Sequence, residues 1–153
     1  PVGIVVLAAL ASLSLVRDNG RAMIANFGLI ALGLMIAGLS SLAFSLHWIG
    51  AIGWMIALGG GLYLAYTPFN GLLFDRLVAV NGEVGNAGFL IYVADASGYA
   101  GSVALLMVKN FGGLHLAWTH FLIDAGIGTC VIGLVLLVVT AIFFRRHFVT
   151  GAA

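Results

Sequence analysis

Residues 86–108, NAGFLIYVADASGYAGSVALLMV, place one acidic residue, Asp95, near the middle of an otherwise apolar segment. The segment is long enough to cross a bilayer as a helix, which takes about 20 residues. A carboxylate at that depth is costly unless it is paired, protonated or exposed to a polar cavity. The segment therefore predicts a transmembrane helix that carries a functional carboxyl group.

The composition of the whole chain agrees with a location in the lipid bilayer. Of the 153 residues, 63% are hydrophobic and 7% are charged, whereas soluble domains carry about 25% charged residues. A chain with this few charges cannot cover a water-facing surface. We therefore expect it to be an integral membrane protein. It contains no basic run of the kind that binds nucleic acid.

Five apolar stretches follow one another along the chain, at about 1–16, 22–46, 48–73, 86–108 and 117–144. We predict an all-α fold, a polytopic transmembrane helix bundle of about five spans in a single domain. The first stretch is short for a span, and the chain begins at Pro1 rather than at a methionine. Residues 1–153 are therefore expected to be a fragment, or one half, of a larger protein.

The positive charges predict how the spans are oriented. With five spans, all the arginines fall on one side of the membrane and Lys109 falls on the other; the arginines are Arg17, Arg21, Arg76, Arg145 and Arg146. Cytoplasmic loops of membrane proteins carry an excess of Lys and Arg. This side, with the C-terminus, is predicted to be cytoplasmic.

The third stretch is interrupted at Tyr66-Thr67-Pro68-Phe69-Asn70. Proline removes a backbone donor and kinks or breaks a helix. Broken helices at membrane depth often form binding sites in transporters, which makes Thr67 and Asn70 candidate polar contacts. The alternative is a kink near the membrane edge, followed by a short interfacial helix.

Tyr92, Asp95, Tyr99 and Ser102 follow spacings of three, four and three, so they share one helix face. Hydroxyl groups beside a carboxylate can satisfy its lone pairs or relay a proton. We predict that Asp95, Tyr92 and Tyr99 line a substrate or proton pathway. The alternative is a buried hydrogen bond from Asp95 to a neighbouring helix.

His120 and Asp124 are four residues apart and form a second candidate pair, because histidine titrates near neutrality. The alternative is a mutually satisfied pair near the surface. The single cysteine, Cys130, fits no metal motif, and the histidines lack a ligand spacing. No arrangement typical of a catalytic site is present, so we expect no enzyme activity, no metal and no cofactor.

Two stretches carry a resemblance to known families, YTPFNGLLFDRLVA (66–79) and GNAGFLIYVADASGYAGSVALLMVKNFG (85–112), with Trp118 and Phe121 beyond them. They resemble an uncharacterised bacterial family of facilitator-like integral membrane proteins. The chain as a whole resembles the C-terminal half of a major facilitator superfamily protein. In that comparison RDNGR (17–21) resembles the short basic loop between paired helices.

The resemblance implies a facilitator-like bundle in a bacterial inner membrane and suggests a role in transport. The first hypothesis is part of a secondary transporter of an unknown small molecule, coupled to protons through Asp95 and working against an N-terminal helical bundle. Arg17, Asp18 and Arg21 would then form a cytoplasmic gate. The alternative is a non-catalytic accessory or structural subunit that docks with other membrane subunits.

Overall fold

The computed structural model describes residues 2–16, 18–81, 86–111, 117–144 and 146. Nearly all of the described residues are helical and none forms a strand, which confirms the all-α prediction. The elements are α1 (Val2–Ser14), α2 (Asn19–Ser45), α3 (Ala51–Pro68), the π-helical segment η1 (Phe69–Leu73), α4 (Phe74–Asn81), α5 (Ala87–Phe111) and α6 (Trp118–Phe144).

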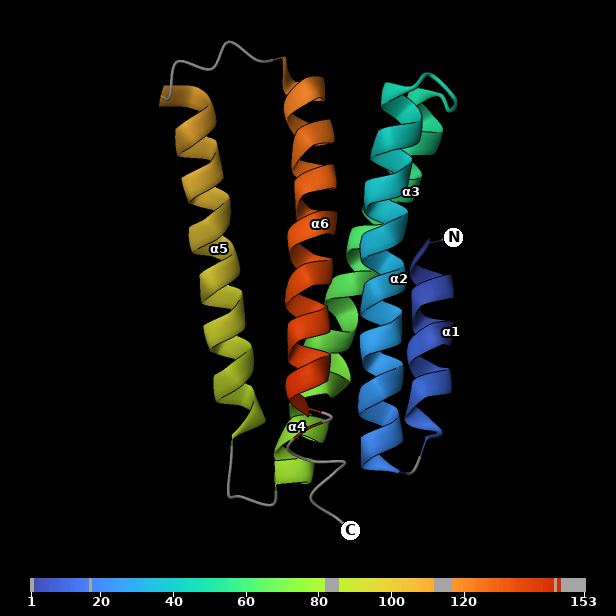
Figure 1. Ribbon diagram of the computed structural model, residues 1–153, viewed down its shortest axis with the longest axis vertical. Coiled ribbons are helices and arrows are strands. Elements are labelled where there is room, and N and C mark those ends of the chain that lie inside the picture. The colour runs from blue at the N-terminus through green and yellow to red at the C-terminus, as the bar shows by residue number, and fades with distance from the viewer. Residues whose placement is uncertain (1, 17, 82–85, 112–116, 145, 147–153) are drawn as a thin grey trace.

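The long helices run side by side along the long axis of the molecule (Figure 1). Helix α2 is central, because it packs against both α3 and α6. Helix α5 stands at the outer edge of the bundle (Figure 1) and contains no buried residue. At one end it is held to α6 by Lys109, whose Nζ lies 3.7 Å from the centre of the Trp118 ring, a cation–π contact.

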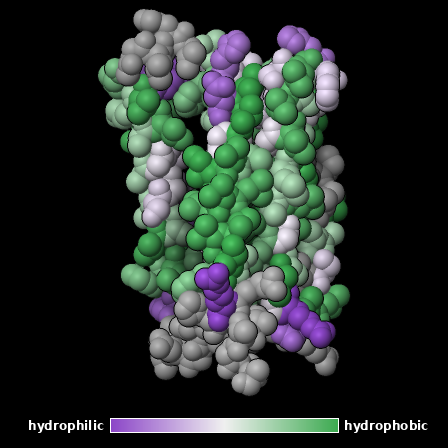
Figure 2. Space-filling model, in the orientation of Figure 1, coloured by the Kyte–Doolittle hydropathy of each residue, from purple (hydrophilic) through white to green (hydrophobic). Residues whose placement is uncertain are grey.

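Three helices are long and apolar enough to cross a membrane, α2 over Gly20–Ser45, α5 over Ala87–Phe111 and α6 over Trp118–Phe144. On the face shown in Figure 2, hydrophobic side chains cover the middle of the molecule and hydrophilic ones lie toward its two ends. These features are compatible with an integral membrane protein. Helices α1 and α3 have 13 and 18 residues, so the five-span count stays a prediction.

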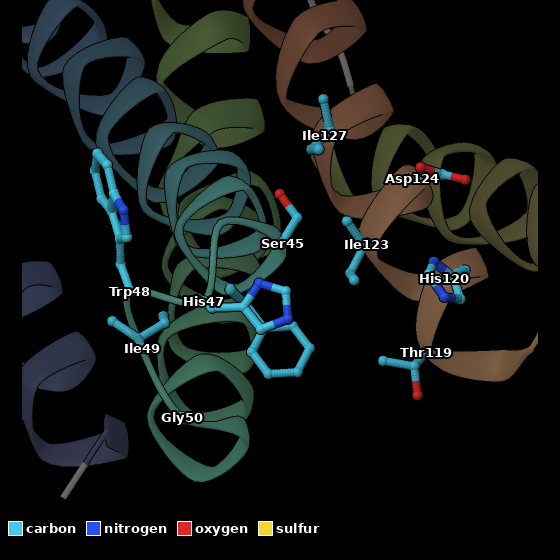
Figure 3. Close-up of a pocket in the computed structure, with 11 residues that line it drawn as sticks. Ser45, His47, Trp48, Ile49, Gly50, Thr119, His120, Ile123, Asp124 and Ile127 are labelled. Carbon is cyan, nitrogen blue, oxygen red and sulfur yellow. The ribbon is translucent and has the colours of Figure 1, made fainter.

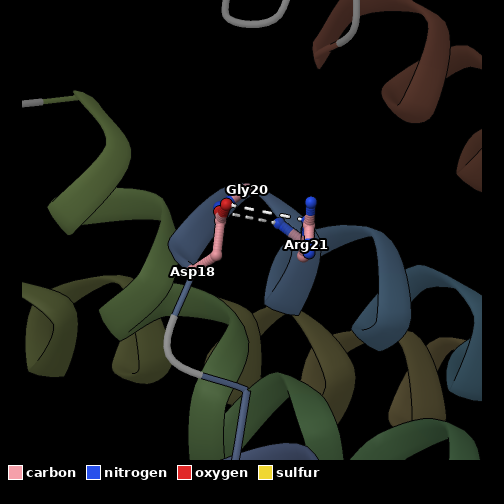
Figure 4. Close-up of polar contacts among 3 residues, drawn as sticks. All are labelled: Asp18, Gly20 and Arg21. Atoms are coloured by element: carbon pink, nitrogen blue, oxygen red, sulfur yellow. Dashed lines mark hydrogen bonds and ion pairs between the residues drawn. The ribbon is translucent and has the colours of Figure 1, made fainter.

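The start of α2 explains the polar residues of the RDNGR loop. Asp18 is the N-cap of this helix, and its Oδ1 accepts hydrogen bonds from the backbone N–H groups of Gly20 at 2.8 Å and Arg21 at 3.1 Å (Figure 4). The Arg21 Nε lies 3.8 Å from Asp18 Oδ2. An acidic cap satisfies backbone donors that have no partner inside the helix.

Glycines allow α2 and α3 to pack in backbone contact. A Cβ atom added at Gly33 would lie 2.5 Å from the backbone N of Ala65 and 2.6 Å from the backbone O of Gly61. A Cβ added at Gly61 would lie 2.7 Å from the backbone N of Ala37. Small residues at such crossings let membrane helices approach closely, so the Gly33 and Ala37 pair serves packing within the chain.

Glycines also allow α2 and α6 to pack closely, at two positions along the helices. A Cβ atom added at Gly38 would overlap the Cys130 side chain, which occupies that space. One turn earlier in α6, Gly126 faces Ser41, whose Oγ would lie 2.5 Å from an added Cβ. Ser41 in turn accepts a hydrogen bond from Trp54 Nε1 at 3.2 Å, so α2, α3 and α6 meet around this hydroxyl group.

Asn26 of α2 is a buried polar residue, like Ser40 and Ser41, but its side chain has no hydrogen-bond partner. The side chain is fully buried, and neither its Oδ1 nor its Nδ2 has a hydrogen-bond partner. Gly33 faces Gly61 and Ala65 of α3. Because α3 runs antiparallel to α2 (Figure 1), Asn26, about two turns earlier, lies at the level of η1.

Replacing Asn26 by leucine is expected to stabilise the protein by about 1–3 kcal/mol, because it removes the cost of burying two unpaired polar atoms. The measurement is the thermal unfolding midpoint in detergent, followed by circular dichroism. Ser41→Ala is the matched control in the same helix: it deprives Trp54 of its acceptor and should lower the midpoint. A lower midpoint for Asn26→Leu would mean that this amide has a partner in the natural protein.

Candidate functional site

The centre of the candidate site is a hydrogen bond between two helices. The Tyr66 hydroxyl group, near the end of α3, donates to Asp95 Oδ1 of α5 at 2.8 Å. The two residues are 29 positions apart in the chain. Asp95 is half-buried although its helix lies at the edge of the bundle. The carboxyl group predicted from the sequence therefore meets α3, as in the alternative interpretation of a hydrogen bond to a neighbouring helix, although Asp95 is only half-buried.

Tyr66 lies immediately before the break in its helix. Pro68 is buried at the end of α3, and from Phe69 to Leu73 the chain is π-helical before it returns to α-helix at Phe74. The interruption predicted from Pro68 is therefore a change of helix type, without a loop. Inserted π-helical turns often occur at functional sites.

The two polar residues predicted at this break are placed differently. Thr67 donates a hydrogen bond from its Oγ1 to the backbone O of Tyr63 at 2.6 Å, so its hydroxyl group serves its own helix. The backbone of Asn70 belongs to η1. The hydrogen bond of Thr67 is typical of a threonine inside a helix.

The tyrosines that flank Asp95 along α5 are exposed. Tyr92 is 78% exposed and Tyr99 is 76% exposed. Ser102 bonds the backbone O of Gly98 at 2.9 Å, within its own helix. The tyrosine that binds Asp95 comes from α3, whereas Tyr92 and Tyr99, on the same side of α5 as Asp95, remain exposed.

An apolar pocket of about 380 Å³ lies beside Tyr66, between α2, α3 and α6. Its walls include the rings of Phe27, Tyr66 and Phe69. No charged side chain lines it among the described residues. A second cleft, of about 460 Å³, lies between α5 and α6; it shares Thr129 and Gly133 with this pocket and is also lined by Asp124.

A larger pocket of about 700 Å³ lies at the other end of α6, between its first turns and the α2–α3 turn. It contains His47, His120 and Asp124 (Figure 3). His120 and Asp124 come from one helix and His47 from the turn opposite (Figure 3). Among the described residues no three His, Cys, Asp or Glu side chains are grouped closely enough to hold a metal ion.

His47 has an uncommon backbone conformation for a residue other than glycine, with φ of 61°. It directly follows the C-cap of α2, where the His47 N–H bonds Phe44 O at 3.0 Å and the Trp48 N–H bonds Ala43 O at 2.9 Å. This is the Schellman arrangement, which usually has glycine at this position. A histidine here costs about 1 kcal/mol of backbone strain, and it places an imidazole in the pocket.

The predicted cytoplasmic gate is partly described. Asp18 and Arg21 contact each other as the cap of α2, and Arg17 lies outside the described residues. Arg76 of α4 donates from its Nη2 to the backbone O of Val16 at 3.3 Å. This contact brings the RDNGR loop and α4 to the same end of the bundle, whereas the last turn of α5, which contains Lys109, is at the opposite end (Figure 1).

Comparison with known families decides the classification of the chain. Residues 1–147 match a family of unknown function, DUF5690. The chain belongs to the DUF5690 family. No curated protein and no solved structure matches this DUF5690 member, so its function has to be inferred from its own residues.

One residue of the site in this DUF5690 chain, Tyr66, is not predicted by the sequence, because nothing in the sequence pairs it with a carboxylate 29 residues away. The buried amide of Asn26 does have a sequence signal, since an amide inside the apolar run AMIANFGLIA (22–31) is as unusual as Asp95 in its own run.

Proposed function

We propose that this DUF5690 chain is part of a secondary transporter of a small molecule, in which protonation of Asp95 controls the contact between α5 and α3. The observation that carries the proposal is the hydrogen bond from Tyr66 to Asp95, next to the π-helical break. The substrate pathway then includes Asp95 and Tyr66, with Thr67 and Asn70 on the broken helix and Tyr92 and Tyr99 on α5.

Protonation changes the strength of this contact. A hydrogen bond to a charged group contributes about 1.5–3 kcal/mol, and one between neutral groups about 0.5–1.5 kcal/mol. Proton uptake by Asp95 therefore weakens the contact by about 1–2 kcal/mol, which shifts a two-state equilibrium by about 5- to 30-fold. Helix α5 has no buried residue, so few other contacts oppose its movement.

The break supplies the place where α3 can bend. Pro68 provides no backbone N–H, and the π-helical turn after it shifts the hydrogen-bond pattern of the helix. A change in the Tyr66–Asp95 contact is therefore made directly beside the most deformable part of α3. This adjacency supports coupling between proton binding and helix movement.

The facilitator-like arrangement belongs to the same proposal. Five spans require α1 and the continuous α3–η1–α4 segment to cross the membrane in addition to α2, α5 and α6. In that topology the end that carries Arg21 and Arg76 is cytoplasmic, with the C-terminus, in a bacterial inner membrane. Asp18 and Arg21, with Arg17, would gate the cytoplasmic side against an N-terminal bundle.

A second candidate function is an accessory subunit of a larger membrane complex. The exposed phenols of Tyr92 and Tyr99 favour it, because hydrocarbon offers a hydroxyl group no hydrogen bond. Gly98 and Gly101 of the same helix have nothing within 4 Å of an added Cβ, unlike the glycines at the α2 crossings. These glycines lie on another side of α5 from Tyr92 and Tyr99, so neighbouring membrane subunits on both sides of the helix would account for the two observations.

Sided labelling of Asp95 distinguishes the two functions. Right-side-out and inverted membrane vesicles are treated with a membrane-impermeant carbodiimide and an amine, and Asp95 is followed by mass spectrometry. If Asp95 lines a transport pathway, it is expected to be labelled from at least one side. The Asp95→Asn variant gives the background signal. Exposed Asp75 of α4 is the positive control. Protection of Asp95 from both sides would contradict the transporter and favour the accessory subunit.

A further inference from the structure

We infer that the apolar pocket beside Tyr66 binds a hydrophobic organic cation, with the positive charge directed to the Asp95 carboxylate. The inference rests on the proposed function, because it names the substrate class of the same site. The pocket volume of about 380 Å³ lies within the range of small-molecule sites, about 300–1,000 Å³.

The lining of the pocket favours a ligand whose main part is apolar. Its lining is almost entirely hydrocarbon, from residues such as Ile30, Leu34, Leu73 and Leu137. The polar side chains in the lining are the hydroxyl groups of Tyr66, Thr129 and Thr140. Thr140 already donates to the backbone O of Leu136 at 2.8 Å. A strongly polar solute would lose its hydration here with few bonds in return.

The charge of the ligand follows from Tyr66. This residue lines the pocket and donates a hydrogen bond from its hydroxyl group to Asp95, so a carboxylate lies next to an aromatic residue of the lining. Aromatic rings attract cations through their faces, and Phe27 and Phe69 add two further rings. A carboxylate next to an aromatic residue of the lining favours a cation over an anion of the same shape.

The described lysine and arginine side chains lie outside the lining of the pocket. Lys109 lies over the Trp118 ring, Arg21 contacts Asp18, and Arg76 bonds Val16 O. Arg146 is exposed beyond the end of α6 and does not line the pocket either. The charge of a bound organic cation would therefore meet no positive side chain among the described lining residues.

The test compares two probes of nearly identical shape and opposite charge, tetraphenylphosphonium and tetraphenylborate. Equilibrium binding of each radiolabelled ion is measured to the natural protein in nanodiscs, with empty nanodiscs subtracted and without a pH gradient. We expect saturable binding of tetraphenylphosphonium alone. Asp95→Asn should weaken it at least about 10-fold, and Asp95→Glu should restore most of the affinity.

Bulk added to the pocket provides a second line of evidence. Thr129→Leu extends a side chain into the pocket and should weaken tetraphenylphosphonium binding. Thr119→Leu, on the same helix but in the other pocket, should leave it unchanged. Equal binding of the two ions, or wild-type binding by Asp95→Asn, would overturn the inference and assign the space to lipid chains or to packing.

The result of the cation-binding test can be distinguished from the result of the test of the transporter proposal. Binding of tetraphenylphosphonium with Asp95 protected from both sides in the labelling experiment would contradict the transporter and leave the pocket assignment intact. Labelling of Asp95 without cation binding would contradict the ligand class alone. Circular dichroism of each variant checks that a loss of binding is not a loss of fold.

Discussion

Replacing Asp95 by asparagine is expected to abolish solute-driven proton movement while leaving the helix bundle folded and inserted. Asparagine keeps the shape of the side chain and can still accept a hydrogen bond from Tyr66, but it cannot take up or release a proton. The measurement uses proteoliposomes of the natural protein with a pH indicator inside, challenged with organic cations, organic anions and neutral solutes. The rate of proton movement with the variant should not exceed the rate in empty liposomes.

Two further variants show whether the effect is specific to the Tyr66–Asp95 contact. Tyr66→Phe removes the hydrogen bond but keeps the carboxyl group, and it should slow proton movement about 10-fold, as expected for about 1.4 kcal/mol. Asp75→Asn changes an exposed carboxylate of α4 and should behave as wild type. Proton movement at the wild-type rate in Asp95→Asn would show that this residue is not the coupling site.

Replacing Gly33 by leucine is expected to destabilise the protein by at least about 3 kcal/mol, a large part of the 5–15 kcal/mol typical of a folded protein. The added Cβ alone would lie 2.5 Å from the backbone N of Ala65 and 2.6 Å from Gly61 O. Backbone atoms cannot turn away as a side chain can, so α2 and α3 must separate. Thermal unfolding in detergent and the yield of monodisperse protein measure the effect.

The control for this prediction lies in the same helix. A Cβ atom added at Gly28 has nothing within 4 Å, so Gly28→Leu introduces the same side chain without a collision. It should leave stability unchanged or raise it by up to about 1 kcal/mol, because leucine favours the helix more than glycine does. A similar loss for both variants would show that the crossing at Gly33 is not the cause.

The sequence was most informative about helix content and about the acidic residue. Long apolar runs predicted helices, and the prediction was confirmed because backbone groups inside an apolar run pair most readily within one helix. Asp95 stood out because a single carboxyl group in such a run is costly. Pro68 marked the change of helix type, since its effect is local and needs no knowledge of the fold.

The partners of these residues could not be predicted. Which face of α5 meets α3 depends on how the helices pack, and the periodic apolar pattern that reveals a buried face in soluble proteins is absent when lipid surrounds the bundle. Tyr92 and Tyr99 were therefore obvious candidates by helical spacing, whereas Tyr66, which bonds Asp95, comes from another helix. The contact between Gly126 of α6 and Ser41 of α2 could not be predicted for the same reason.

Cys130 of α6 packs against Gly38 of α2, so the reactivity of its native thiol would report the separation of these two helices. The Cys130 side chain occupies the space that Gly38 leaves free between α6 and α2, and the thiol is half-buried and unpaired. A maleimide can reach the sulfur more readily when these two helices part. The rate of alkylation of the natural protein would thus follow the opening of the bundle, with no engineered label, as proton or ligand concentration is changed.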